Sequence, residues 1–277
     1  MLQNQSSHPS IPAFYINLNR DVSRRARIEE ELANSRIQAE RIPAIEGRAV
    51  PDWLQSFYDD RLGPGEVGCS ASHLTICRII IERDLPFALI LEDDARIEKD
   101  CRGAIEIAVK LAPRGWDIIR LIESSSRPFQ QVGVIDPGRS LVRYLRVPRS
   151  TTGLVVSQSG ARKLLTPRLV KEPIDVEIRW PWQLDLDVYG IHPPPVTQAS
   201  GVEVETTIPT RSRPKKRNQL RRMIFNIRKM GLASYLACIF ARDCKPTPQS
   251  EDLYARSHTV SAAGRPTRTV GRQNFGC

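Results

Sequence analysis

The sequence predicts an α/β domain with a central mixed, mostly parallel sheet, followed by a basic helical appendage. Two observations predict this class. Apolar runs of strand length alternate with segments of helical spacing, and one run is apolar at every position, as in a strand buried on both faces. The 277 residues suffice for one large domain with appendages. We expect a flexible N-terminus at 1–10, the main domain at 11–208, a basic amphipathic helical segment at 209–243 and a disordered tail at 244–277.

The first expected strand spans residues 13–18, and a helix capped by Asp21 follows it. Strand, polar turn and helix form the first half of a nucleotide-binding unit. The turn and the start of the helix contain Arg20 and Arg24, whose guanidinium groups suit a phosphate or a nucleobase. A solvated helix face is the alternative role for these arginines.

A second helix is expected from Glu66 onward, because the apolar residues there recur at helical spacing. Ser72 and His73 lie near its amino-terminal turns, and a helix start that faces a crevice is a ready anion site. The alternative for His73 is a core or surface histidine that a backbone carbonyl satisfies.

Residues 87–91 form the continuously apolar run, and the acids Glu92, Asp93 and Asp94 follow it directly. The carboxyl end of such a strand opens into the crevice where α/β sheets bind ligands. Three adjacent carboxylates repel one another unless a cation or a proton relieves them, and their oxygens suit Mg²⁺ or Mn²⁺. The triplet indicates a diphosphate bridged to the protein by a metal; a solvated acidic turn is the open alternative.

Further elements alternate along the rest of the main domain. Helices are expected at 101–111 and 159–165, strands at 116–122, 151–157 and 184–191, and an edge strand at 141–147. Before the last strand, Pro173 makes a rigid turn that leads to Asp175. A lone aspartate in a loop is more often a turn former than a base.

The composition is that of a protein without a membrane span. No stretch approaches the ~20 apolar residues that a bilayer requires, and the polar start contains no signal-peptide core. We therefore expect a cytoplasmic protein. The six cysteines show no zinc-site spacing, so reduced thiols are expected.

The net charge of +10 is concentrated near the C-terminal end, where residues 211–229 contain nine Lys and Arg and no acid. From residue 220 onward, apolar residues at helical spacing alternate with basic ones. This pattern is typical of a helix that lies on an anionic membrane surface. It predicts a peripheral position on the cytoplasmic face of the inner membrane. A helical hairpin packed on the domain, with solvated basic faces, is the alternative.

Other functional classes fit less well. Basic residues alone give affinity for nucleic acid, but here they are confined to the tail, and the main domain has no recognised nucleic-acid motif. No nucleic-acid partner is therefore expected. A metal-dependent phosphotransferase or nuclease also uses clustered carboxylates, although the absence of a Gly-x-x-x-x-Gly-Lys loop argues against the first.

Six short motifs, in this order and spacing, resemble glycosyltransferase family 25 over about residues 11–200. They are 16–20 with Arg24, 44–47, 65–69 with Ser72 and His73, 89–94, Gly153 with Ser157 and 160–161, and 173–175. That family includes bacterial lipooligosaccharide β-galactosyltransferases and related collagen galactosyltransferases. The resemblance implies a GT-A-like nucleotide-sugar-binding domain, a UDP-sugar donor, a divalent metal and inversion at the anomeric carbon.

The resemblance also implies a reaction. Residues 11–208 become a glycosyltransferase catalytic domain that moves a hexose to a glycan or glycolipid acceptor such as lipooligosaccharide core. Galactose is the sugar that the family suggests, and glucose is the near alternative. A degenerate transferase-like domain that binds without catalysing remains the other alternative.

Site residues follow from the same resemblance. The acidic triplet occupies the position of the family's Asp-x-Asp signature, which makes Asp94 and Glu92 the expected ligands of Mn²⁺ or Mg²⁺, with Asp93 as the alternative to Glu92. The expected donor-binding residues are Asn17, Arg20, Arg24, Ser72, His73, Glu92 and Asp93.

An inverting transfer also needs a carboxylate that takes the proton of the acceptor hydroxyl. Asp175 is our first choice, because it matches the family's Pro-x-Asp motif. Asp117, Asp185 and Asp187 are its competitors.

Overall fold

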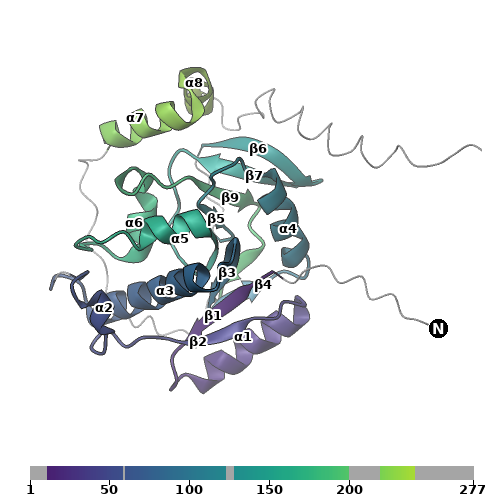
Figure 1. Cartoon of the computed structure of the whole chain (residues 1–277). Coiled ribbons are helices and arrows are strands. Elements are labelled where there is room, and N and C mark those ends of the chain that lie inside the picture. Colours follow the sequence, from purple (N-terminus) through teal and green to yellow (C-terminus); the bar gives the residue numbers. More distant parts are fainter. Residues whose placement is uncertain (1–10, 59, 123–127, 200–218, 241–277) are drawn as a thin grey trace, which may run out of the picture.

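The computed structural model describes residues 11–58, 60–122, 128–199 and 219–240. The segments predicted to be flexible or disordered, 1–10 and 244–277, lie outside the described residues, as do 200–218. The main domain has three layers, in which helices cover both faces of one large sheet (Figure 1).

Eight strands form this sheet in the order β2-β1-β3-β8-β5-β9-β7-β6. Their bounds are β1 Ala13–Asn17, β2 Glu40–Pro43, β3 Phe87–Glu92, β5 Ile118–Arg120, β6 Phe129–Asp136, β7 Arg139–Tyr144, β8 Gly153–Ser157 and β9 Val188–His192. Strand β1 is parallel to β2 and β3, and β5 is parallel to β9, but the other four pairings are antiparallel.

The prediction of a mixed sheet is therefore confirmed, and the prediction that it is mostly parallel is wrong. Strand β8 lies in reverse direction between β3 and β5, and β6 and β7 are consecutive strands of a hairpin. A tight hairpin connection makes its two strands antiparallel.

Helices α1 (Val22–Asn34) and α4 (Cys101–Leu111) cover one face of the sheet. The other face carries α3 (Pro64–Glu82), α5 (Gln158–Leu164) and α6 (Ile174–Arg179). Strand β3 contributes to both cores, because its side chains alternate between the faces. This double burial is the reason that residues 87–91 are apolar at every position.

Strands β1, β3, β5 and β9 point in the same direction, because β8 is antiparallel to both β3 and β5. We call the side where these four strands end the carboxyl edge of the sheet. Asn17, Glu92 and Arg120 are the last residues of β1, β3 and β5 there. The opposite side, where β5 and β9 begin, is the amino edge.

The remaining short elements are α2 (Asp52–Gln55), the 3₁₀ turn η1 (Pro181–Gln183), and a two-stranded antiparallel ribbon of β4 (Ala95–Ile97) and β10 (Val196–Gln198). The expected helix at 101–111 is confirmed, and the expected strands are present with shifted ends. The prediction of an edge strand at 141–147 is wrong, since β7 lies between β9 and β6. Strand β6 has no counterpart among the expected strands, although Pro137-Gly138 is a hairpin signal.

The described part of the basic segment contains two helices, α7 (Gln219–Met230) and α8 (Leu232–Phe240). Within the described residues, neither helix alone has the length and hydropathy of a membrane span; the two together reach them but are bent by 117°. Cys69, Cys77 and Cys101 are free thiols. The expectation of reduced thiols is wrong for Cys238, which is disulfide-bonded.

Candidate functional site

The acidic triplet lies at the carboxyl edge, directly after β3. Asp93 and Asp94 are both buried. Backbone hydrogen bonds fix the triplet on two sides: the N–H of Glu92 donates to the carbonyl of Thr152, and the N–H of Ala199 donates to the carbonyl of Asp94, each at 2.9 Å. The carboxylates are thus held in place by the segment before β8 and by the residue after β10.

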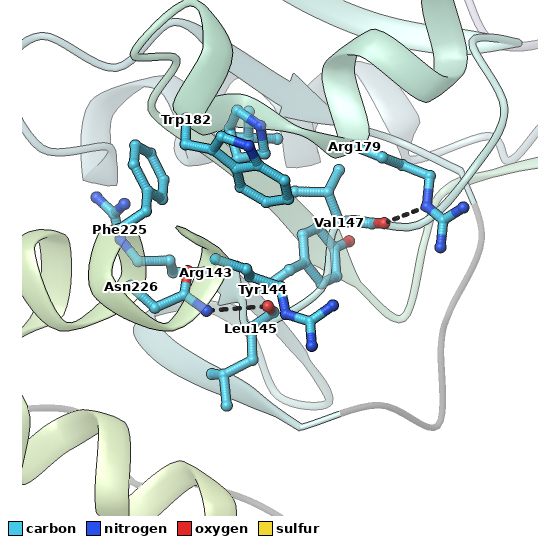
Figure 2. Close-up of a pocket in the computed structure, with 11 residues that line it drawn as sticks. Arg143, Tyr144, Leu145, Val147, Arg179, Trp182, Phe225 and Asn226 are labelled. Carbon is cyan, nitrogen blue, oxygen red and sulfur yellow. Dashed lines mark hydrogen bonds between the residues drawn. The ribbon is translucent and has the colours of Figure 1, made fainter. Parts of the chain in front are cut away.

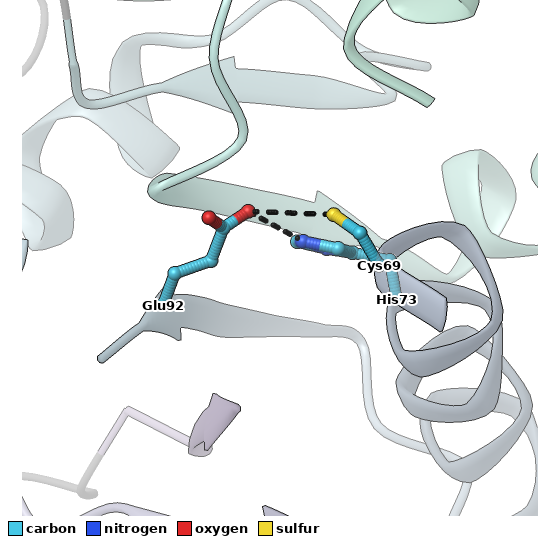
Figure 3. Close-up of side chains that lie close together, drawn as sticks. All are labelled: Cys69, His73 and Glu92. Atoms are coloured by element: carbon cyan, nitrogen blue, oxygen red, sulfur yellow. Dashed lines mark hydrogen bonds and ion pairs between the residues drawn. The ribbon is translucent and has the colours of Figure 1, made fainter. Parts of the chain in front are cut away.

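Glu92 is the centre of a hydrogen-bond network, and Figure 3 shows its contacts with Cys69 and His73 of α3. Its Oε1 accepts a bond of 2.6 Å from the hydroxyl of Thr151 and lies 3.0 Å from Nε2 of His73. The thiol of Cys69 lies 3.9 Å from the same oxygen. Burial raises the pKa of Glu92, but the contacts with His73 and Thr151 outweigh it, and the pKa is lower than usual.

Cys69, His73 and Glu92 also form a possible metal site, because their ligand atoms lie within 4.8 Å of one another. Sulfur, imidazole and carboxylate together suit Zn²⁺ rather than Mg²⁺ or Mn²⁺. Hydrogen bonding alone accounts for the geometry, however, since Oε1 already accepts from two good donors. We therefore regard this cluster as the connection between α3 and β3.

Asp93 lies between a cation and an amide. A guanidinium nitrogen of Arg24 forms an ion pair with Oδ1, and the amide of Asn17 donates to Oδ2 at 2.7 Å. Arg41 in turn bonds the amide oxygen of Asn17. Burial raises the pKa of Asp93 above its ordinary value even though Asn17 and Arg24 lower it.

Asp94 is the least satisfied of the three acids. Its Oδ2 accepts a bond of 2.7 Å from Gln198, and Arg24 is 3.7 Å away. Its Oδ1 is buried and has no hydrogen-bond partner among the residues that the structure describes. Burial and the neighbouring Glu92 raise the pKa of Asp94. A buried carboxylate with an unused oxygen, next to two other acids, is a fitting ligand for a hard divalent cation.

Two predicted donor-binding residues have other contacts. Arg20 is exposed and pairs with Glu46 at 2.8 Å. The hydroxyl of Ser72 donates to the carbonyl of Gly68 and accepts the N–H of Ile45, so it connects α3 to the segment after β2. Asn17, Arg24 and His73, by contrast, all contact the triplet. The donor-binding roles of all five remain predictions.

The competing base candidates lie on the wrong side of the sheet. Asp117 and Asp187 directly precede β5 and β9, at the amino edge. Asp117 pairs with Lys163 at 2.6 Å, and Asp185 pairs with Arg228 of α7. The length of the strands separates these three aspartates from the triplet, which argues against them as the base.

Asp175 is buried in the first turn of α6. The chain before this helix approaches the carboxyl edge: Val170 pairs with Tyr58, whose hydroxyl lies 3.3 Å from that of Ser70, next to Cys69 on α3. None of the described side chains that contact the triplet belongs to α6. Asp175 as the base therefore remains a prediction.

The sequence did not predict several residues that lie at this edge. Thr151 and Gln198 contact the triplet from segments distant in the sequence. Arg120 is fully buried at the end of β5 and donates to the carbonyl of Ser150 at 2.5 Å. The sequence could have indicated Arg120, because it is a charged residue at the end of an apolar strand, where α/β sheets place ligand contacts.

A mixed α/β sheet with buried carboxylates at its carboxyl edge defines a class of proteins that bind their ligand at that edge. The family model described as "Glycosyltransferase family 25 (LPS biosynthesis protein)" matches residues 10–177. This chain belongs to glycosyltransferase family 25, and the resemblance seen in its motifs is confirmed.

Curated relatives are similar to part of this chain. The inactive glycosyltransferase 25 family member 3 of Mus musculus is 28% identical in an alignment of 189 residues that covers 62% of this chain and 31% of the relative. Procollagen galactosyltransferase 1 of Danio rerio is 28% identical in an alignment of 185 residues that covers 59% of this chain and 30% of the relative. The chain thus covers about a third of the length of these relatives.

Proposed function

We propose that this protein is a metal-dependent, inverting glycosyltransferase of GT-A type that moves a hexose from a UDP-sugar to a glycan acceptor such as lipooligosaccharide core. The observation that carries the proposal is Asp94, whose buried Oδ1 lacks a partner in the described part of the chain. An ionised group buried in this state is costly. Family membership supports transfer chemistry, and the names of the Danio rerio and Xenopus laevis relatives support galactose.

Oxygen donors at the triplet fit Mn²⁺ or Mg²⁺. Asp94 would be the principal ligand, with a second oxygen from Glu92 or Asp93. Such an ion, when bound, neutralises the charge that builds up on a departing diphosphate. Because Oε1 of Glu92 is already engaged by His73 and Thr151, its contribution would come from its other oxygen.

The residues around the ion would orient the donor. Nε of Arg24 is buried and has no hydrogen-bond partner among the described residues, while its Nη2 faces both Asp93 and Asp94. A phosphate oxygen would satisfy this donor in a charge-assisted bond. Asn17 fixes Asp93 and so keeps Arg24 in position.

On the acceptor side, Asp175 is proposed to take the proton of the attacking hydroxyl. It lies on α6, which packs against α3, the helix that also carries His73. Glu177, the other acid in the same turn, pairs with Arg168 at 2.7 Å and is engaged in that contact. Asp175→Asn is expected to keep UDP binding and lose turnover, because only proton transfer is removed.

A second candidate function is donor binding without catalysis. It is favoured by the description of the Mus musculus relative as inactive. Arg24 also partly neutralises both Asp93 and Asp94, which lowers their demand for a cation.

The deciding experiment measures UDP release and sugar transfer from a panel of UDP-sugars, with lipooligosaccharide core fragments as acceptors. It is done with Mn²⁺ and with EDTA, for wild type, Asp94→Asn and the matched control Asp100→Asn, whose carboxylate is exposed and pairs with Arg139. We expect transfer with one donor, a loss of at least about 100-fold in Asp94→Asn, and no change in the control.

Each outcome has a defined meaning. Transfer that persists in EDTA and in Asp94→Asn would remove the metal from the proposal. Calorimetric binding of UDP and Mn²⁺ without transfer to any acceptor would favour the second candidate. If neither UDP nor a UDP-sugar binds, the transferase proposal is rejected.

A further inference from the structure

Helix α7 packs on the domain through one of its faces (Figure 2). Phe225 and Asn226 are buried, and the amide of Asn226 donates to the carbonyl of Leu145 at 3.0 Å. One turn later, the ammonium of Lys229 lies 3.2 Å from a carboxylate oxygen of Asp187. These residues define the docked face of α7, which is partly polar.

The apolar residues of α7 point away from the domain. Leu220 and Ile224 are 62% and 57% exposed, and Met223 is also exposed. At about 100° per residue, Ile224 and Leu220 lie roughly 150° and 170° around the helix axis from the middle of the buried pair Phe225 and Asn226. These two side chains therefore lie opposite the docked face, and Met223 lies on its flank. A surface helix of a soluble domain normally has the reverse orientation.

Helix α8, which follows the bend at Gly231, exposes apolar side chains as well. Leu232 and Leu236 are exposed, and Phe240 is 85% exposed, whereas Cys238 is buried. We define the outer apolar surface by its exposed large residues, Leu220, Met223, Ile224, Leu232, Leu236, Ile239 and Phe240. An apolar surface of this extent on one side of a protein marks an interaction site.

The charge around this surface indicates its partner. The two helices, residues 219–240, contain four Lys and Arg and no acidic residue, and five more Lys and Arg precede them in the sequence at 211–217. Arg228 and Lys229 are paired with the domain, but Arg221 is exposed beside the apolar residues. Two copies of this chain would bring two basic surfaces together, which is unfavourable. Anionic lipid headgroups supply the opposite charge and, beneath them, an apolar phase.

We propose that the outer apolar surface docks this protein onto a bilayer that contains anionic lipid, with its apolar side chains at the level of the upper acyl chains. The docking does not depend on the transferase function. Helix α7 contacts Asp187 at the amino edge of the sheet, so the carboxyl edge with the acidic triplet is turned away from the bilayer. If the transferase function holds, this orientation suits an acceptor whose sugar end projects from the membrane.

The test is flotation of the full chain with vesicles of phosphatidylcholine alone and of phosphatidylcholine with 30% phosphatidylglycerol (about the anionic content that gives a strong surface potential). Ile224→Glu and Phe240→Glu place a charge on the outer apolar surface. The matched control is Ile107→Glu, an equivalent change at an exposed isoleucine on α4. Thermal unfolding of each variant shows whether it is folded.

We expect wild type and the control to float with the anionic vesicles only, and to be released as salt increases. Both surface variants should bind at least about 10-fold more weakly, since a buried charge opposes insertion. Equal binding by wild type and both surface variants would overturn the proposal. Absence of binding by wild type would also overturn the membrane proposal. Sedimentation would then show what covers the outer apolar surface: a concentration-dependent dimer means a second copy, and a monomer means the chain's own residues.

UDP-sugar turnover, measured on the same samples, tests the proposed transferase function separately from membrane binding.

Discussion

Glu92 connects the chemistry of the site to the packing beneath it. One oxygen of its carboxylate faces His73 of α3 and Thr151 of the segment before β8. The geometry thereby joins three parts of the chain at the point where the acidic triplet begins. A residue at such a position contributes to stability even when no donor is bound.

A double-mutant cycle of His73→Phe and Glu92→Gln measures this contribution. Each single variant leaves one polar partner unsatisfied, and the double variant relieves this, so we expect a coupling of about 1–2 kcal/mol in the free energy of unfolding by urea. The value is below that of a fully buried ion pair because Glu92 is only partly buried. A control cycle pairs His73→Phe with Glu82→Gln on the same helix, and we expect it to be additive. Additivity in both cycles would contradict the inferred contact.

Sequence reasoning found the triplet and its nearest cations but not all of its partners. The run of three acids after an apolar strand predicts buried carboxylates at a sheet edge, and Asp93 and Asp94 are buried there. His73 bonds a carboxylate 19 positions away rather than the backbone carbonyl of the alternative interpretation. Thr151 and Gln198 had no local signal, because their contacts depend on how separate loops meet in space.

At the scale of elements, two motifs of the family turn out to pack on each other. A Cβ atom on Gly68 of α3 would lie 2.3 Å from the carbonyl oxygen of Ile45, and one on Gly47 would lie 1.8 Å from that of Pro64. The hydroxyl of Ser72 adds a bond of 2.8 Å to the N–H of Ile45. The absence of side chains at these two glycines therefore allows the backbone of α3 to contact the backbone of the segment after β2.

Gly68→Ala is expected to destabilise the protein by about 2–4 kcal/mol, because the neighbouring atom is backbone and cannot move aside cheaply. The matched control is Gly103→Ala in α4, where a Cβ meets nothing within 4 Å. It should stabilise by about 0.5–1 kcal/mol through helix propensity. Urea unfolding compares the two; a small effect of Gly68→Ala would mean that the two segments separate easily.

Docking of α7 is expected to depend on pH through Asp187. Burial raises the pKa of this carboxyl, but Arg143 at 2.9 Å and Lys229 at 3.2 Å outweigh it, and the pKa is lowered. A lowered pKa stabilises the folded state fully above the unfolded value of about 3.9. This stabilisation is lost as the pH falls through the folded pKa, which lies lower still.

Asp187→Asn should therefore cost about 1 kcal/mol at pH 7. The difference from wild type should disappear as the pH falls below about 3.9. Urea unfolding between pH 7 and pH 3 measures it. Asp136→Asn at an exposed carboxylate serves as the control, and we expect little difference at any pH. A difference for Asp187→Asn that is constant with pH would show that the ion pairs do not stabilise the docked helix.

At the scale of the whole molecule, the layered α/β fold was predictable and the strand directions were not. Apolar periodicity identifies helices and strands, but it does not say that β8 lies reversed between β3 and β5. Periodicity also shows which residues of α7 share a face without showing which face is docked. Only the structure reveals that the buried pair is Phe225 and Asn226 and that the apolar stripe points outward.

The whole molecule also provides the most direct test of the proposed metal site, because a ligand that binds only the folded state raises the melting temperature. At a concentration of 100 times Kd, binding stabilises by about 2.7 kcal/mol, which is on the order of 5–10 °C for a domain of this size. We expect Mn²⁺ and UDP together to raise the melting temperature of wild type and of Asp100→Asn by more than the sum of their separate effects. In Asp94→Asn the combined shift should be lost.

If Mn²⁺ instead stabilises Asp94→Asn as much as wild type, the ion binds elsewhere. A larger shift with Zn²⁺ that Cys69→Ser abolishes would then identify the cluster of Cys69, His73 and Glu92 as its site.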